Sequence, residues 1–217
     1  MSGSSAKLYS YWRSSCSWRV RTALALKNIP YEYLAVNLIK DGGQQHADEY
    51  KSLNPAELVP TLIIDGHTLT ESVAIIEYLD ETHPEPPLLP KNAVERAKVR
   101  ALSLHIVAGI QPIQNAAVLN YVGEKKSAWA QHWIAKGLTS LEAMLSKTSG
   151  RYSYGDSVTM VDLCLVPQIY NAIRFQVDLN AFPICKRIYD DLIKLDAFRA
   201  SHPSRQPDTP DNEKAKD

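Results

Sequence analysis

Ser14, Ser15 and Cys16 place two hydroxyls and a thiol side by side near the start of the chain. They lie between a short β-prone run, residues 7–12, and a helical pattern over residues 16–27. The first turn of a helix exposes unpaired amide N–H groups and the positive end of the helix dipole. Because such a terminus stabilises an anion, including a thiolate, the segment predicts an anion or thiolate site. The alternative is that Ser14 or Ser15 simply caps the helix.

Three arginines, Arg13, Arg19 and Arg21, surround this predicted helix start. A positive charge beside a helix N-terminus is locally unfavourable. An anionic ligand is therefore one explanation for at least one of these arginines. Surface ion pairing is the other explanation for each of them.

Two dipeptides further along the chain also carry polar or backbone chemistry. Val59-Pro60 precedes an apolar, strand-like run, and a proline without an amide donor is tolerated at such a strand start. Glu71-Ser72 opens a helical pattern over residues 71–82, where both side chains suit a first helical turn. A plain helix start and a ligand site explain Glu71 and Ser72 equally well, so both explanations stay open.

Two polar groups belong to the second half of the chain. Gln111 and Asn115 are four residues apart in a helical pattern, so we expect them to share one helix face. They predict either a ligand contact or a water site between helices. Thr159 and Asp162 form a capping box with a structural role.

The local patterns predict two domains. Strands are expected at 7–12, 31–37, 61–64 and 68–70, and helices at 16–27, 47–53 and 71–82. This β-α-β-α-β-β-α order, with helices on both faces of a mixed sheet, predicts a thioredoxin-like α/β domain over residues 1–84. Residues 85–92 are the expected linker, and 93–217 the expected all-helical domain. Within it, residues 204–217 are rich in proline and charge, and we expect them to be on the surface or disordered.

The composition excludes several functions. Twenty-four basic and 24 acidic residues cancel, so no global field attracts nucleic acid or an anionic membrane. No apolar run approaches the ~18 residues of a membrane span. Three cysteines without a CxxC pair suit a reducing compartment, which predicts a cytoplasmic protein. The six histidines are scattered without metal-ligand spacing, so no metal site is predicted.

The octapeptide SSCSWRVR at residues 14–21 resembles the signature of zeta-class glutathione transferases, a family that includes maleylacetoacetate isomerases. The resemblance extends through residues 37–40, 43–45, 54–55, 59–62, 75–79, 109–115 and 201–210. It implies a glutathione transferase fold, in which a thioredoxin-like domain precedes an all-α domain. It also implies a homodimer that uses glutathione as cofactor.

The same resemblance implies a role for each candidate residue. Ser14 or Ser15 would donate a hydrogen bond to the glutathione sulfur beside Cys16, and Arg174 matches a family position for a substrate carboxylate. Arg13 is assigned to the same substrate role from its charge beside the predicted helix start. Glutathione would also be bound by Gln45, Val59, Glu71, Ser72, Gln111 and Asn115, with Val59 contributing its backbone beside a cis Pro60. Which of Ser14, Ser15 and Cys16 activates the thiol is left open.

The activity that the resemblance implies is cis–trans isomerisation of maleylacetoacetate to fumarylacetoacetate in phenylalanine and tyrosine catabolism, with transferase activity on α-haloacids. A detoxifying transferase or dehalogenase is the main alternative, because the same thiolate would serve both reactions. A non-enzymatic glutathione-binding scaffold and a redox enzyme that uses Cys16 itself are further alternatives. A mitochondrial fraction of the protein is not decided by the sequence.

Overall fold

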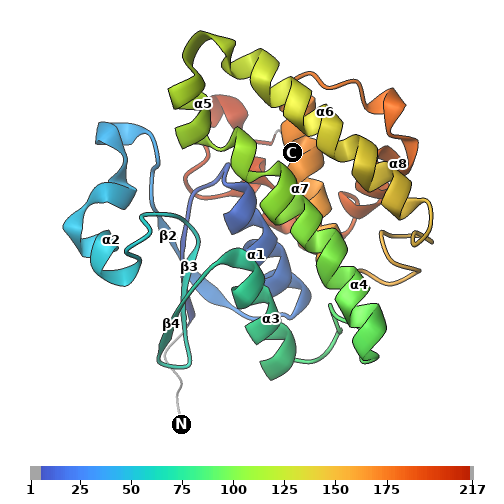
Figure 1. Cartoon of the computed structure of the whole chain (residues 1–217). Helices are drawn as coiled ribbons and strands as arrows, with labels where there is room; N and C mark the ends of the chain where they lie inside the picture. Colours follow the sequence, from blue (N-terminus) through green and yellow to red (C-terminus); the bar gives the residue numbers. More distant parts are fainter. Residues whose placement is uncertain (1–5, 216–217) are drawn as a thin grey trace. The chain divides into compact units, whose positions relative to one another are not determined.

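The computed structural model of the 217-residue chain describes residues 6–215 and divides into two compact units (Figure 1). Unit 1 joins the residues up to Pro86 with those from Asp196 onward, and unit 2 is Pro87–Leu195. The break after the first domain therefore falls within the predicted linker. The end of the chain, which was expected to belong to the helical domain, is instead part of unit 1.

Unit 1 contains a mixed four-stranded sheet in the order β2-β1-β3-β4. Its strands are β1 (Ala6–Ser10), β2 (Tyr31–Ala35), β3 (Thr61–Ile64) and β4 (His67–Thr70), and its helices are α1 (Ser15–Leu26), α2 (Asp48–Leu53), α3 (Ser72–Thr82) and α9 (Asp196–Ser201). β1 pairs in parallel with β2 and antiparallel with β3. This arrangement confirms the predicted thioredoxin-like α/β class.

The hydrophobic pattern explains how this sheet and its helices meet. Leu8 on β1 and Leu62 on β3 have no exposed surface, and neither do Leu24 on α1 and Ile76 on α3. Helices α1 and α3 lie side by side against the sheet (Figure 1). Because both helices bury apolar faces there, their N-terminal ends are held in fixed positions.

Unit 2 is helical, as the sequence predicts. Its α-helices are α4 (Ala93–Leu104), α5 (Ala116–Val122), α6 (Lys126–Leu145), α7 (Met160–Arg174) and α8 (Pro183–Leu192). Most side chains of α7 are buried. Its N-terminus carries the predicted capping box, in which the Thr159 N–H donates to Asp162 Oδ2 at 2.7 Å. Cys164 and Cys185 are free thiols without exposed surface, which agrees with their expected place in the core.

The stretch from α4 to α6, Ala93–Leu145, is long and apolar enough by composition to be considered as a membrane span, with a mean hydropathy of 1.2 in its best window. It is several elements rather than one helix. A π-helical segment, His105–Ile110, is followed by a 3₁₀ turn at Pro112–Gln114 and by extended backbone at Asn115. Core helices of soluble proteins pass the same composition test, so the stretch is weak support for a membrane span.

The C-terminal segment agrees only in part with the expectation that residues 204–217 lie on the surface or are disordered, because most of its described residues, 204–215, are exposed while two are buried and hydrogen-bonded. Gln206 and Thr209 are buried, and the Asp208 carboxylate accepts the Trp12 N–H at 2.9 Å and the Tyr33 O–H at 2.6 Å. α9 packs against α1 just before this segment. Hydrogen bonds from polar side chains therefore fix the segment, although its composition lacks the apolar residues that predict burial.

We expect Asp208→Ala to lower the free energy of unfolding by about 1–3 kcal/mol, because a partly buried N–H and O–H lose their acceptor. The measurement is urea unfolding. Asp211→Ala is the matched control, since the Asp211 side chain is 94% exposed and is paired with the nearby Lys214. Equal midpoints for the two variants would show that the Asp208 contacts contribute nothing.

His202, just before this segment, makes the stability of the fold sensitive to acid. Burial lowers the pKa of its imidazole from 6.5 to about 4, with smaller contributions from Arg21 and Arg205. Between these two values the unfolded chain binds a proton that the folded chain does not, so stability should fall as the pH falls from about 6.5 to about 4. His202→Asn retains an acceptor for the Ser204 N–H, which His202 Nδ1 accepts at 3.1 Å. Unfolding curves across this range should be less pH-dependent for His202→Asn; an unchanged slope would contradict the assignment.

Candidate functional site at the start of helix α1

Ser14 is the N-cap of α1, with φ −67° and ψ 120°. Its Oγ accepts the Ser17 N–H at 3.2 Å, so the capping alternative holds for this serine. A hydroxyl that accepts one hydrogen bond still has its own proton to donate. Ser14 and Cys16 are partly exposed at this end of the helix, whereas Ser15 is buried. Ser14 is therefore the better placed of the two serines to cap the helix and also donate to an anion.

Arg21 has a structural role, which differs from both roles expected for these arginines, the anion site and the surface ion pair. It has no exposed surface, and burial lowers its pKa. Its Nε donates to the Ser201 carbonyl at 3.1 Å and its Nη2 to the Trp12 carbonyl at 3.0 Å. Nη1 donates to Ser10 Oγ at 3.1 Å and to the Tyr11 carbonyl at 3.3 Å. Arg21 thus holds the loop that delivers Ser14 to the helix start.

Arg19 joins the N-terminal ends of two helices. Its side chain is fully buried, so a surface ion pair is excluded. Its Nη1 lies 3.2 Å from Ser72 Oγ and 3.6 Å from Cys16 Sγ. The structure thereby brings together the predicted Cys16 and Ser72. Arg13, by contrast, stacks its guanidinium 5.3 Å from the Trp12 ring centre.

Glu71, the residue before α3, has an uncommon backbone conformation, with φ 65° and ψ 113°. A non-glycine residue in this region costs free energy and is often found at ligand sites. Its carboxylate is exposed and does not cap α3, whereas Ser72 is buried as the first residue of that helix. Glu71 is therefore free to meet a cationic group at the same helix end.

Two further predicted ligand residues have unused polar groups. The Val59–Pro60 peptide is cis, as the resemblance implied, and no hydrogen bond of the described residues uses the Val59 backbone. The Gln45 side chain folds back over Gly43, where an added Cβ would lie 2.5 Å from Gln45 Nε2. Gln45 Nε2 lies 3.0 Å from His46 Nε2, and Oε1 is buried without a partner among the described residues.

Comparison with known proteins agrees with this arrangement. The profile described as "Glutathione S-transferase, N-terminal domain" matches residues 8–87, and "Glutathione S-transferase, C-terminal domain" matches residues 113–202. The chain belongs to the glutathione S-transferase family. Mouse maleylacetoacetate isomerase is 55% identical over 94% of this chain and 94% of its own length. Probable maleylacetoacetate isomerase 2 of Drosophila melanogaster is 58% identical over 94% of this chain and 90% of that protein.

Similar solved structures agree with the zeta class that the sequence predicts within the glutathione S-transferase family. A maleyl pyruvate isomerase described as a bacterial zeta-class glutathione S-transferase is 44% identical, with a TM-score of 0.90 over 94% of this chain and all of that one. Maleylacetoacetate isomerase from Anaeromyxobacter dehalogenans, with glutathione bound in its active site, is 47% identical, with a TM-score of 0.86, over 95% of this chain and 98% of that one. The predicted zeta-class resemblance, fold and enzyme class are confirmed, and the bound tripeptide in that relative agrees with the predicted cofactor.

The residues at the ends of α1 and α3 fit glutathione by their own chemistry. The tripeptide has a thiol, an ammonium group and two carboxylates. For a carboxylate the chain presents the unpartnered Arg19 donors and the hydroxyl of Ser72, and for the ammonium group the exposed Glu71 carboxylate. For the thiol it presents the Ser14 hydroxyl, and for the peptide groups the Val59 backbone and the unpartnered acceptor Gln45 Oε1. Each polar class of the tripeptide therefore has a complementary group in this glutathione S-transferase unit.

The other predicted ligand residues, Gln111, Asn115 and Arg174, belong to unit 2 of the transferase. Gln111 and Asn115 do not share a helix face, which corrects the prediction from their spacing. Pro112 begins a separate 3₁₀ turn, and Asn115 is the extended N-cap of α5, where its Oδ1 accepts the Val118 N–H at 2.9 Å. Arg174 is exposed at the end of α7 and stacks 5.0 Å from the Phe175 ring.

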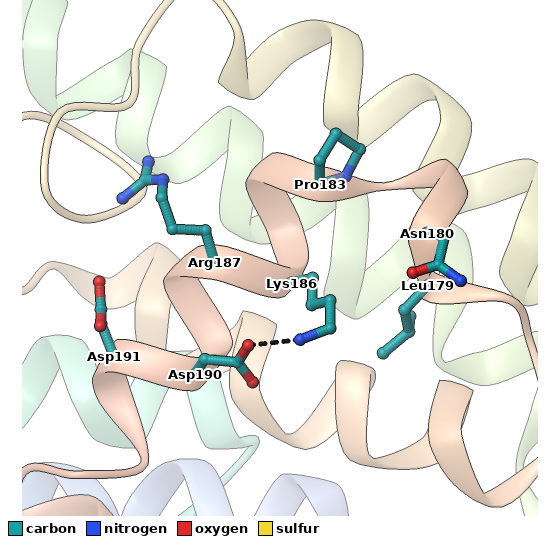
Figure 2. Close-up of a pocket in the computed structure, with 7 residues that line it drawn as sticks. All are labelled: Leu179, Asn180, Pro183, Lys186, Arg187, Asp190 and Asp191. Carbon is teal, nitrogen blue, oxygen red and sulfur yellow. Dashed lines mark hydrogen bonds and ion pairs between the residues drawn. The ribbon is translucent and has the colours of Figure 1, made fainter.

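A hollow on α8 of unit 2 lacks the features of a ligand site (Figure 2). Its Lys186 is paired with Asp190 at 2.6 Å, and Arg187 donates to the carbonyls of Gly150 and Arg151 at 2.9 Å each. These cations are already neutralised or bonded. The hollow contains none of the predicted site residues.

Proposed function

We propose that this chain is a glutathione-dependent isomerase that converts maleylacetoacetate to fumarylacetoacetate in phenylalanine and tyrosine catabolism. The observation that carries the proposal is the α1 N-terminus, where the Ser14 hydroxyl keeps a free proton beside Cys16. The choice of substrate is supported by the relatives at 55% and 58% identity, which are a maleylacetoacetate isomerase and a probable maleylacetoacetate isomerase. We further propose that it acts as a cytoplasmic homodimer, for which the three free cysteines and the family resemblance are the support.

Glutathione, when bound, supplies a thiolate that adds reversibly to the activated double bond, so that rotation becomes possible before the thiol is released. A free thiol with a pKa near ~8.5 is only a few per cent ionised at neutral pH. Lowering that pKa by ~2 units requires ~2.7 kcal/mol of differential stabilisation. The Ser14 hydroxyl and the amides of the first α1 turn are the groups that provide it. Glu71, Ser72, Val59 and Gln45 hold the tripeptide in place.

The proposed function is tested by mixing the purified protein with maleylacetone, a stable analogue, and following its conversion to the trans isomer. We expect conversion with glutathione, no conversion with S-methylglutathione, and no net consumption of glutathione. Dichloroacetate turnover is measured in parallel. Turnover of dichloroacetate without isomerisation of maleylacetone would favour the dehalogenase, and the absence of both activities would favour a scaffold.

Arg174 and Arg13 are the residues proposed to hold the substrate carboxylates. We expect Arg174→Ala to raise the KM for maleylacetone about tenfold, because a charge-assisted hydrogen bond is lost, and to spare a neutral substrate such as an alkyl halide. Arg151→Ala is the matched control, since Arg151 is also an exposed arginine stacked on a neighbouring aromatic ring, Tyr152, at 5.2 Å. Steady-state kinetics on both substrates provide the measurement. Equal effects on the charged and neutral substrates would remove Arg174 from the site.

A further inference from the structure

Two arginines on α1, both without exposed surface, differ sharply in how they are bonded. All three guanidinium nitrogens of Arg21 donate to oxygens of the chain. Arg19 uses only Nη1, while its Nε and Nη2 are buried and have no hydrogen-bond partner among the described residues. The part of the chain from residue 6 to 215 also places no carboxylate within 4.0 Å of Arg19. Arg19 is thus a buried cation without a counter-ion among the residues that the structure describes.

The surroundings of Arg19 add to this positive charge rather than neutralise it. Its Nη1 contacts Cys16 in the first turn of α1 and Ser72 at the start of α3. These helices have 12 and 11 residues, and the N-terminus of each carries the positive end of a helix dipole. A buried charge without compensation destabilises a fold, and an anion bound beside Arg19 would remove that cost.

We propose that Arg19 is a positioning residue for the α-carboxylate at the γ-glutamyl end of glutathione, a role that rests on the proposed function. Because Arg19 donates to Ser72 Oγ at 3.2 Å, the Ser72 hydroxyl acts as its acceptor and keeps its single proton for the ligand carboxylate. The charge of Arg19 is neutralised when that carboxylate is bound. Arg19 therefore acts through Ser72. Because the Arg19 side chain is buried, a bound ligand does not displace it.

This role has a consequence that a purely structural arginine would not have. Without ligand, the unneutralised charge costs stability, so Arg19→Met should leave the thermal midpoint of the free protein unchanged or higher. With ligand, the same substitution should weaken binding of S-methylglutathione, which keeps both carboxylates and lacks a free thiol. We expect its Kd to rise about 10- to 100-fold, the range for a lost charge-assisted hydrogen bond.

The test is a thermal unfolding curve without ligand and a calorimetric titration with S-methylglutathione, for the wild type and Arg19→Met. A lower midpoint with an unchanged Kd would overturn the proposal, because it describes a structural role alone. In a Ser72→Ala background, Arg19→Met should have a less than additive effect on Kd. Full additivity would overturn the statement that Arg19 acts through Ser72.

If Arg19→Met does not fold, Arg19→Lys provides the second variant, since it keeps the charge but loses the planar fork of donors. We expect Arg19→Lys to bind S-methylglutathione at least about threefold more weakly than the wild type, because one ammonium group holds Ser72 less well. Wild-type affinity in Arg19→Lys would overturn the proposal. The wild-type titration separates the two claims: no binding to the wild type contradicts the proposed function, whereas tight binding to both proteins contradicts only the role of Arg19.

Discussion

Ser14→Ala should lower kcat/KM for glutathione-dependent isomerisation about 100-fold, in the range for loss of one hydrogen-bond donor to a developing or resident anion. The hydroxyl that donates to the thiolate is lost, so the pKa of the bound thiol should rise and the pH–rate profile should move to higher pH. The free energy of unfolding should also fall by about 1 kcal/mol, because Ser14 is the N-cap of α1. Kinetics across pH and urea unfolding provide the two measurements.

Ser14→Asp separates the two roles of this residue. An aspartate caps a helix about as well as a serine, so stability should remain close to that of the wild type. An ionised carboxylate has no proton to donate and repels a thiolate, so activity should fall at least as far as in Ser14→Ala. If Ser14→Asp keeps wild-type activity, the hydroxyl is not the donor, and Ser15 or Cys16 takes its place as the candidate.

The parts of the fold that depend on neighbouring residues could be predicted from the sequence. The turn at Asp65 and Gly66 has positive φ at both residues, which suits their types and closes the β3–β4 hairpin. The capping box between Thr159 and Asp162 likewise needs only residues of the same helix end. Alternating and helical hydrophobic patterns gave the order of strands and helices for the same reason.

The parts that depend on distant residues could not be predicted in this way. Asp208 reaches Trp12 and Tyr33, which are 196 and 175 residues away in the chain, and no local pattern reports such a contact. A segment with few apolar residues is ordinarily exposed, and here polar hydrogen bonds replace the missing apolar contacts. The spacing of Gln111 and Asn115 was misleading because Pro112 begins a new turn between them.

The candidate site could likewise be predicted only in part from the sequence. Ser14, Ser72 and the cis bond at Val59 were found through the family signature and helix-start chemistry. The different roles of Arg19 and Arg21 were not predicted, because the two arginines are two residues apart and nothing in the neighbouring sequence distinguishes them. Only burial and the identity of their partners distinguish them, and Ser201, which Arg21 contacts, is 180 residues away.

Arg21→Met should give one of the largest losses of stability in the chain, about 3–5 kcal/mol, because a buried, fully hydrogen-bonded cation is removed and its acceptors stay buried. The abandoned acceptors are Ser10 Oγ and the carbonyls of Tyr11, Trp12 and Ser201. Two of these four, the carbonyls of Tyr11 and Trp12, lie in the loop before Ser14, and Ser10 is the last residue of β1. We therefore expect weaker glutathione binding even at temperatures where the variant is still folded. Urea unfolding and a glutathione titration at low temperature provide the measurements.

Arg21→Lys is the control for charge, since it keeps the cation but can satisfy only part of a set of acceptors arranged around a planar guanidinium. It should recover less than half of the lost stability. Wild-type stability in Arg21→Lys would show that charge alone matters and that the individual hydrogen bonds do not. The different effects expected for Arg19→Met and Arg21→Met on the ligand-free protein follow from one contrast. All three guanidinium nitrogens of Arg21 donate within the chain, whereas the charge of Arg19 is neutralised only when the ligand carboxylate is bound.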